Sequence, residues 1–134
     1  MVGISTKGTY AIAAMYALST SPRQKLLQIK EIAASTQISH GYLEQILATL
    51  KKSDLVISVR GVNGGYKLSR GANEIVVLEI VEALEGKLFM VNENVGASAV
   101  LDSFWADIQQ KVREVFSMKL SELDNSYQIS FYEI

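Results

Sequence analysis

A change of hydrophobic period near the middle of the chain constrains the fold more than any other feature of the sequence. Up to about residue 52, apolar residues recur every three or four positions, which is typical of helices packed against a core. Residues 56–60 and 66–69 alternate instead, and this predicts two short strands. We expect Asn63-Gly64 to supply the positive φ angles of a tight turn between them. The alternation predicts that four apolar residues share one face: Ile57, Val59, Tyr66 and Leu68.

Three helical segments precede this hairpin. Ser5 is a suitable N-cap for a helix that runs to about Ser19, and its largely apolar surface predicts burial. Two short helices follow, joined by the polar turn 35–38, and Ser39 is a suitable N-cap for the second of them. A pair of short helices followed directly by a hairpin is typical of a winged helix-turn-helix, and the combination is much more specific than either part.

The rest of the chain is predicted to be helical, which makes the fold mainly α with a small β-hairpin. We expect a helix from about residues 75–77 to Gly86, a loop over 87–98, a long helix over 99–118, and a tail with a short helix and an extended segment at 129–132. Residues 1–86 would form a winged helix-turn-helix domain. Residues 87–134 would add the loop, the long dimerisation helix and the tail, as one compact unit with the first domain.

The long helix carries a broad apolar and aromatic stripe, which is unfavourable to leave exposed to water. We expect it to pack partly on its own domain and partly on the same helix of a second subunit, which predicts a homodimer. The residues of the stripe are Val100, Phe104, Trp105, Ile108, Val112, Val115 and Phe116.

Charge and composition narrow the classes of function. Residues 1–70 carry a formal charge of +6 and residues 71–134 one of −7, so the first half is suited to a polyanion. The chain has no cysteine and one histidine, so disulfides and thiolate metal sites are excluded and we expect no metal site. No catalytic triad or nucleotide-binding loop is present, which predicts that the chain is not an enzyme. The apolar run 11–18 is too short for a membrane span, and we expect a cytoplasmic protein.

Two exposed elements would bind double-stranded DNA. The start of the second short helix offers groups that can bond base edges or phosphates, although a solvated helix surface is the alternative. These groups belong to His40, Tyr42, Glu44 and Gln45. Arg60, at the entrance of the hairpin turn, is suited to a narrow minor groove, and an ordinary exposed arginine is the alternative. The turn beside it contains Gly61, Asn63, Gly64 and Gly65.

Three runs of residues together carry a family resemblance. They are Ser5-Thr6-Lys7-Gly8 with Tyr10, Ile38-Ser39 with Tyr42-Leu43-Glu44-Gln45-Ile46-Leu47, and Leu55-Val56 through Ser58-Val59-Arg60-Gly61 to Gly64-Gly65-Tyr66-Lys67-Leu68. They resemble the Rrf2 family of bacterial winged-helix transcriptional regulators, which includes iron–sulfur, nitric-oxide and cysteine-metabolism regulators. The resemblance covers residues 4–86 well and the remainder only in plan. Ser5 to Gly8 and the Phe131-Tyr132 ending are most similar to the cysteine-metabolism type.

The resemblance implies a role for each matching residue. Thr6, Lys7 and Tyr10 would contact the DNA backbone. Tyr42, Glu44 and Gln45 would lie on the recognition helix, and Arg60 with the Gly61–Gly65 turn would form a minor-groove wing. The family acts as homodimers on imperfect palindromes, commonly as repressors.

The resemblance also bears on cofactors. Members that sense iron–sulfur clusters carry three cysteines between the wing domain and the long helix, whereas residues 86–98 contain none here. We therefore expect no cofactor. An effector would be a small molecule, a partner protein or a redox signal that does not use cysteine. A small-molecule site around Phe89, Met90 and Trp105 is one option, and core packing of these residues is the other.

The leading hypothesis is a homodimeric repressor that binds a palindromic operator without a cluster. The alternative is a winged-helix module that binds another protein and not a specific DNA sequence.

Overall fold

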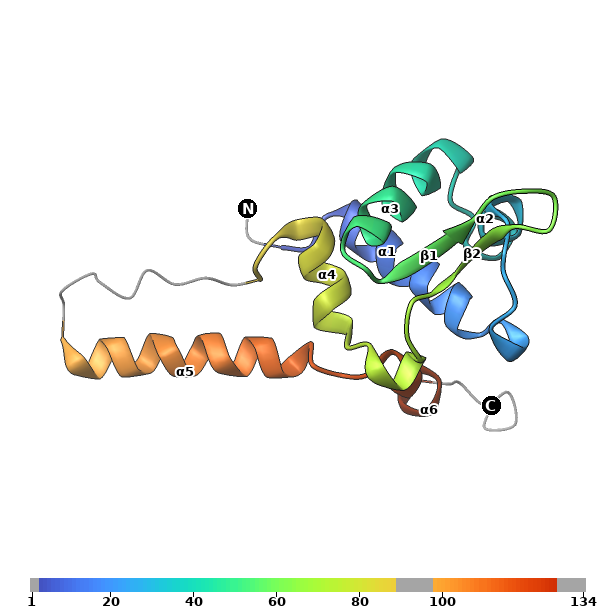
Figure 1. Ribbon diagram of the computed structural model, residues 1–134. Helices are drawn as coiled ribbons and strands as arrows, with labels where there is room; N and C mark the ends of the chain where they lie inside the picture. The colour runs from blue at the N-terminus through green and yellow to red at the C-terminus, as the bar shows by residue number, and fades with distance from the viewer. Residues whose placement is uncertain (1–2, 89–97, 128–134) are drawn as a thin grey trace, which may run out of the picture.

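The computed structural model describes residues 3–88 and 98–127, which are mainly helical with one two-stranded antiparallel hairpin, as predicted. In chain order the elements are α1 (Thr6–Ser19), α2 (Ile29–Thr36), α3 (His40–Lys52), β1 (Val56–Val59), β2 (Gly65–Leu68), α4 (Val77–Glu85), α5 (Ala99–Val115) and α6 (Leu123–Tyr127). Figure 1 shows helices α1 to α4 packed together with the hairpin at one side of them, and α5 projecting away. The segment expected at 129–132, Phe89 and Met90 lie outside the described residues.

Helix α1 lies at the centre of the core and contacts α2, α3, α4 and β2. Its small residues Ala11 and Ala14 are fully buried, so neighbouring helices can approach its backbone closely. Met15 fills the remaining space and is also fully buried. The same core also contains Ile32, Leu43, Ile46, Leu47, Leu50, Leu55, Ile75 and Ile80.

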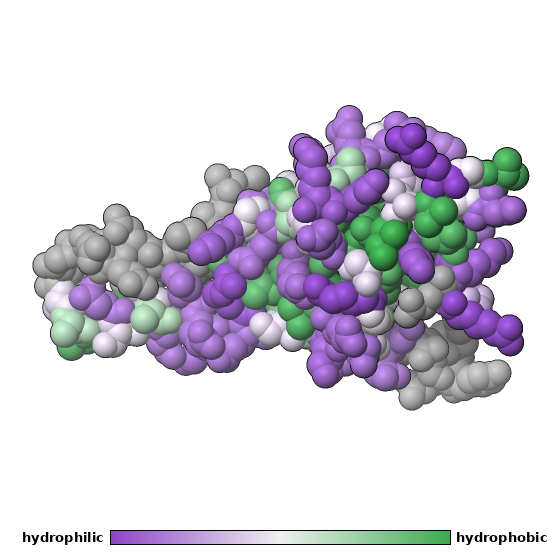
Figure 2. Space-filling view, in the orientation of Figure 1, coloured by the Kyte–Doolittle hydropathy of each residue, from purple (hydrophilic) through white to green (hydrophobic). Residues whose placement is uncertain are grey.

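The register of the hairpin differs from the expectation that four apolar residues share one face. Val56 pairs with Leu68, and Ser58 pairs with Tyr66. Directly paired residues share a face, so Ile57 and Val59 lie on the opposite face, where they are 40% and 45% exposed. The prediction that Ile57 and Val59 share a face with Tyr66 and Leu68 was therefore wrong. Leu55 and Val56 are both buried at the start of the strand and set the phase of the alternation. Figure 2 shows apolar surface over the hairpin.

The turn between the strands also differs from the expectation. Positive φ angles occur at Gly61 (109°) and Gly65 (145°) rather than at Asn63-Gly64. The turn is therefore longer than a two-residue hairpin loop, and the Gly64 N–H closes it by donating to the Gly61 carbonyl at 3.0 Å. Gly64 is required for a different reason: a Cβ there would lie 2.1 Å from the carbonyl oxygen of Val59.

The segment after α5 fastens the long helix to the core. Backbone N–H groups of Val77 and Leu78 donate to the carbonyls of Met118 (2.7 Å) and Phe116 (2.8 Å). Because residues 116–118 turn back to make these bonds, α5 ends at Val115, three residues before the expected end. An ion pair from Arg113 to Glu82 of α4 adds a side-chain contact of 2.7 Å.

Within the described ranges, no helix combines the length and apolar character needed to cross a lipid bilayer.

Candidate nucleic-acid interface

Helix α3 presents a polar face because its other face is fixed in the core. Ser39 caps it as predicted, accepting a hydrogen bond from the Tyr42 N–H at 3.4 Å. Leu43, Ile46, Leu47 and Leu50 are buried on one side of the helix. The spacing of these residues leaves His40, Glu44 and Gln45 exposed on the other side. A side chain that bonds a base edge directly must carry a polar group and must stand on a firmly held helix, and α3 meets both conditions.

The first turn of α1 lies beside α3 and adds a cation. Thr6 and Lys7 are exposed there. The ring of Tyr10 meets the ring of Tyr42 edge to face, with centroids 5.2 Å apart and an interplanar angle of 76°. This ring contact joins α1 to α3, so the two groups of expected DNA-contacting residues form one surface.

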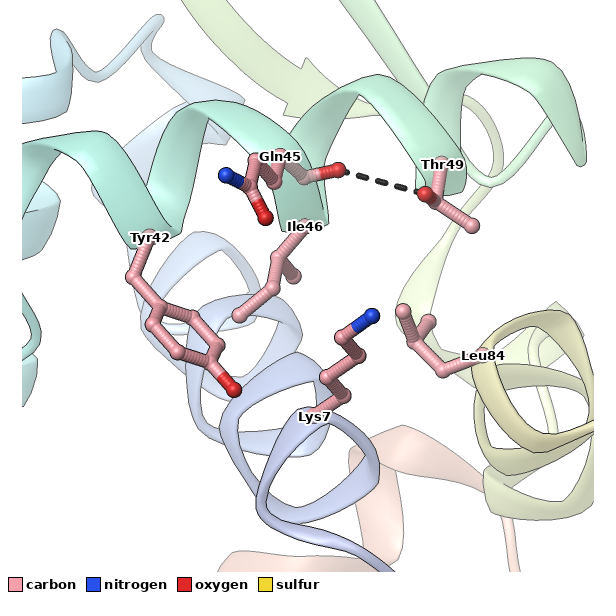
Figure 3. A pocket seen from close by; sticks show the side chains of 6 residues that line it. All are labelled: Lys7, Tyr42, Gln45, Ile46, Thr49 and Leu84. Atoms are coloured by element: carbon pink, nitrogen blue, oxygen red, sulfur yellow. Dashed lines mark hydrogen bonds between the residues drawn. The ribbon is translucent and has the colours of Figure 1, made fainter.

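A small cleft of about 160 Å³ lies where α1, α3 and α4 meet. Figure 3 shows Lys7 extending from α1 so that its ammonium group points into the space bounded by α3 and by Leu84 of α4. The hydroxyl of Thr49 donates to the backbone carbonyl of Gln45 at 3.2 Å. The residues that line the cleft are Lys7, Tyr42, Gln45, Ile46, Thr49 and Leu84. A cation, a phenol hydroxyl and an amide around one opening suit an anionic ligand with hydrogen-bonding groups, such as a DNA phosphate.

Glu85 holds the start of α1 from the end of α4. Its carboxylate accepts hydrogen bonds from the Ser5 N–H at 2.8 Å and from the Ser5 hydroxyl. The Ser5 hydroxyl is therefore turned to Glu85, and Ser5 occupies the N-cap position without the side-chain cap that we expected. These hydrogen bonds from Ser5, together with the nearby positive charge of Lys7, hold the pKa of the Glu85 carboxyl below its ordinary value.

The hairpin turn forms a second, separate part of the interface. Arg60 follows β1 directly and is exposed, as are Gly61 and Asn63, whereas Gly64 is buried and Gly65 half-buried. A hydrogen bond of 3.0 Å from the side-chain amide of Gln28 to the carbonyl of Val62 connects this turn to the start of α2. The structure thus brings Lys7, Tyr42 and Gln45 together in one cleft and holds Arg60 apart on the hairpin.

Three contributors to this surface were missed in the sequence. Thr49 lines the cleft but was not among the expected contact residues. Glu85 and Gln28 act on residues 80 and 34 positions away, and no local pattern marks such contacts. A glycine within a helix, such as Gly8, indicates a close approach without naming the partner; in the structure a Cβ there would lie 2.7 Å from the Glu85 carboxylate.

Helix α5 presents the expected apolar stripe away from the core. None of its side chains is fully buried, and four residues of the stripe are 41–77% exposed: Val100, Phe104, Trp105 and Val115. Ile108, Val112 and Phe116 are half-buried. The rings of Phe104 and Trp105 meet edge to face with centroids 4.9 Å apart. Packing on the chain's own domain therefore covers only part of the stripe.

Comparisons with known proteins agree with this architecture. The sequence model of the Rrf2 family, described as "Iron-dependent Transcriptional regulator", matches residues 4–125. The HTH-type transcriptional regulator IscR of Cereibacter sphaeroides is 41% identical over 97 residues, which are 71% of this chain and 63% of that protein's length. The HTH-type transcriptional regulator CymR of Bacillus subtilis is 32% identical over 124 residues, covering 92% of this chain and 90% of that protein.

Solved structures give the same result. CymR, described as the global cysteine regulator of B. subtilis, superimposes with a TM-score of 0.83 at 32% identity, covering 96% of this chain and all of that one. IscR of T. potens superimposes with a TM-score of 0.75 at 34% identity, covering 96% of this chain and 93% of that one. The chain therefore belongs to the Rrf2 family of winged helix-turn-helix transcriptional regulators, which are not enzymes.

Proposed function

We propose that the chain is a sequence-specific DNA-binding repressor that acts as a homodimer on a palindromic operator. The observation that carries this proposal is the cleft lined by Lys7, Tyr42 and Gln45, which joins a cation to the exposed face of α3. A cation for phosphate, a helix with free polar groups and an exposed arginine on a hairpin are the three parts that a winged helix needs to bind DNA.

Each part of the surface has a separate role in this proposal. Thr6, Lys7 and Tyr10 contact the sugar–phosphate backbone, and α3 lies in the major groove. The major-groove residues are His40, Tyr42, Glu44 and Gln45. Gln45 is suited to adenine, because its amide offers a donor and an acceptor, and Glu44 accepts from a cytosine amino group. Arg60 enters the minor groove, where a narrowed A·T tract has an enhanced negative potential.

The dimer is supported by the apolar surface of α5. A helix with this much exposed aromatic and aliphatic surface gains from pairing with a second copy of itself. In a two-fold dimer the same patch meets itself, and the two copies of α3 face successive half-sites of a palindrome. Binding of such a dimer across a promoter would exclude other proteins from it, and this is the basis for proposing repression.

The residues present do not fit an iron–sulfur cluster, although the family description mentions iron. Protein ligands of such clusters are cysteine thiolates, with histidine in some, and the 134-residue sequence has no cysteine and only His40. His40 lies at the exposed start of α3. Among the described residues, no three His, Cys, Asp or Glu side chains gather closely enough to hold a metal ion. We therefore propose that this protein responds to a signal other than a cluster.

Selection of bound sequences from random duplex DNA tests the proposal directly. We expect one palindromic site to be enriched at moderate salt. If no sequence is enriched and binding shows no salt dependence, the DNA-binding proposal fails and the protein-interaction alternative is favoured.

Two substitutions then separate the roles of the cations. Arg60→Ala should weaken binding by about 1–3 kcal/mol and relax the base preference at the positions that the wing contacts. Lys7→Ala should weaken binding to all sequences alike and reduce the slope of log K against log salt concentration by about one. Equal behaviour of the two variants would contradict the separation of roles.

A further inference from the structure

Gln28 occupies an unusual position for its residue type. It is the N-cap residue of α2, where short side chains such as Ser, Thr, Asp and Asn are favoured because they can accept from the first backbone N–H groups of the helix. The glutamine side chain does not cap the helix here. Instead, Glu31 accepts the Gln28 backbone N–H at 3.0 Å, and the amide of Gln28 extends in another direction.

The amide of Gln28 crosses to the tip of the hairpin turn. Its Nε2 donates to the carbonyl of Val62 at 3.0 Å, between residues 34 positions apart in the chain. Val62 is 90% exposed, so it has almost no packing of its own. In the part of the chain that the structure describes, this is the one side-chain hydrogen bond between the turn 61–64 and another element. An open groove separates the two elements on either side of the bond.

The start of β2, next to the turn, is held in a different way. Leu27 forms an isolated antiparallel bridge with Tyr66, with N–O distances of 2.9 Å and 2.8 Å. Gly65 makes this approach possible, because a Cβ there would lie 2.5 Å from the Leu27 carbonyl oxygen. Backbone pairing therefore fixes the start of β2 to the residue before Gln28, and Gln28 itself restrains the tip of the turn.

We propose that Gln28 is a positioning residue for the wing: it restrains the turn that follows Arg60 at a set distance from the helix-turn-helix before DNA is bound. Restraint in the free protein reduces the conformational entropy that is lost on binding. The inference rests on the proposed DNA binding. It assigns a role in that binding to Gln28, which would itself contact neither base nor phosphate.

Two variants remove the restraint in different ways. Gln28→Met keeps the length and neutrality of the side chain but removes the donor. Gln28→Ser removes the reach while supplying a favoured N-cap, so any loss of function in it does not come from a weaker helix. Gln110→Met is the matched control. Gln110 donates a hydrogen bond of 2.9 Å to Glu114 within α5, is far from the turn in the sequence and has no proposed role in DNA binding.

The first readout does not depend on DNA. Amide order parameters of residues 61–64 in the full-length protein should fall in both Gln28 variants, toward the range below about 0.6 that marks flexible backbone, and should not change in the Gln110 variant. Unchanged order parameters in Gln28→Met and Gln28→Ser would overturn the inference, whether or not the protein binds DNA.

The second readout is binding to the selected duplex. We expect both Gln28 variants to bind roughly 3- to 10-fold more weakly, as for the loss of one hydrogen bond, with an unchanged salt slope. Combining Gln28→Met with Arg60→Ala should cause no further loss beyond Arg60→Ala alone, since the restraint acts through the wing. Additive losses would overturn the positioning role. Failure of the unmodified protein to bind any duplex would instead refute the proposed function.

Discussion

The glycines of the hairpin turn allow backbone strain to be separated from steric contact. Gly61 has a φ of 109°, and a Cβ there would meet no atom within 4 Å. Gly65 has a φ of 145°, and a Cβ there would also lie 2.5 Å from the Leu27 carbonyl oxygen. Gly61→Ala therefore tests the strain alone, and Gly65→Ala tests strain and contact together.

The structure allows the loss of stability to be estimated for each substitution. An L residue forced into a sparsely populated positive-φ conformation costs about 1–3 kcal/mol, which is the expected loss for Gly61→Ala. In Gly65→Ala the new methyl group must also displace Leu27 and disturb its two backbone hydrogen bonds with Tyr66. At about 0.5–1.5 kcal/mol for each bond, the further loss is about 1–3 kcal/mol. The total of about 2–6 kcal/mol is a large part of the stability of a typical domain, about 5–15 kcal/mol.

Urea unfolding followed by far-ultraviolet circular dichroism measures these losses. Gly41→Ala is a suitable control, because Gly41 is exposed within α3 and a Cβ there has open space. Alanine should stabilise that helix position by about 0.5–1 kcal/mol. If Gly65→Ala costs no more than Gly61→Ala, the close approach of Leu27 to the hairpin does not limit residue 65, and the account of how Leu27 holds the start of β2 is wrong.

Three further predictions address the recognition helix, the link to α5 and the dimer. Ser39→Ala should lower the free energy of unfolding by about 1 kcal/mol in urea titrations, because the cap of α3 is lost. The hydrogen bond from Arg113 holds the pKa of Glu82 below its ordinary 4.5, so the pair should stabilise the fold fully above pH 4.5 and lose this effect as the pH falls through the lowered pKa. Arg113→Met should therefore flatten the acid side of a plot of stability against pH, and an unchanged slope would argue against the pair. Trp105→Glu should shift sedimentation from dimer to monomer while changing the stability of the monomer little, whereas Ser103→Glu on the opposite face of α5 should leave the dimer intact.

The local features of the helices and the hairpin were predictable because they depend on neighbouring residues. The N-cap role of Ser39 and the end of α1 at Ser19 follow from side-chain chemistry and hydrophobic spacing within one or two turns. The polar face of α3 follows in the same way from the spacing of its buried leucines and isoleucine.

The phase of β1 and the form of the turn were not predictable in this way. Alternation shows that successive residues face opposite sides, but it does not say which side is the core. That choice depends on Val56 packing beneath the helices, and it left Ile57 and Val59 outside. Asn63-Gly64 is a common hairpin turn, but the positive φ angles lie at Gly61 and Gly65, and the close approach of Leu27 to Gly65 depends on the tertiary fold.

The sequence by itself determined the winged helix-turn-helix, its family and the exclusion of a cysteine-bound cluster, because periodicity, motif order and composition are properties of the chain alone. Only the tertiary structure decided which residues act together: Lys7 with Gln45 at one cleft, Glu85 with Ser5, and Gln28 with the tip of the wing. The physical reason is that hydrogen bonds and ion pairs act over a few ångströms in space. Contacts between residues 34 to 80 positions apart depend on how the helices pack and leave no periodic signal in the sequence.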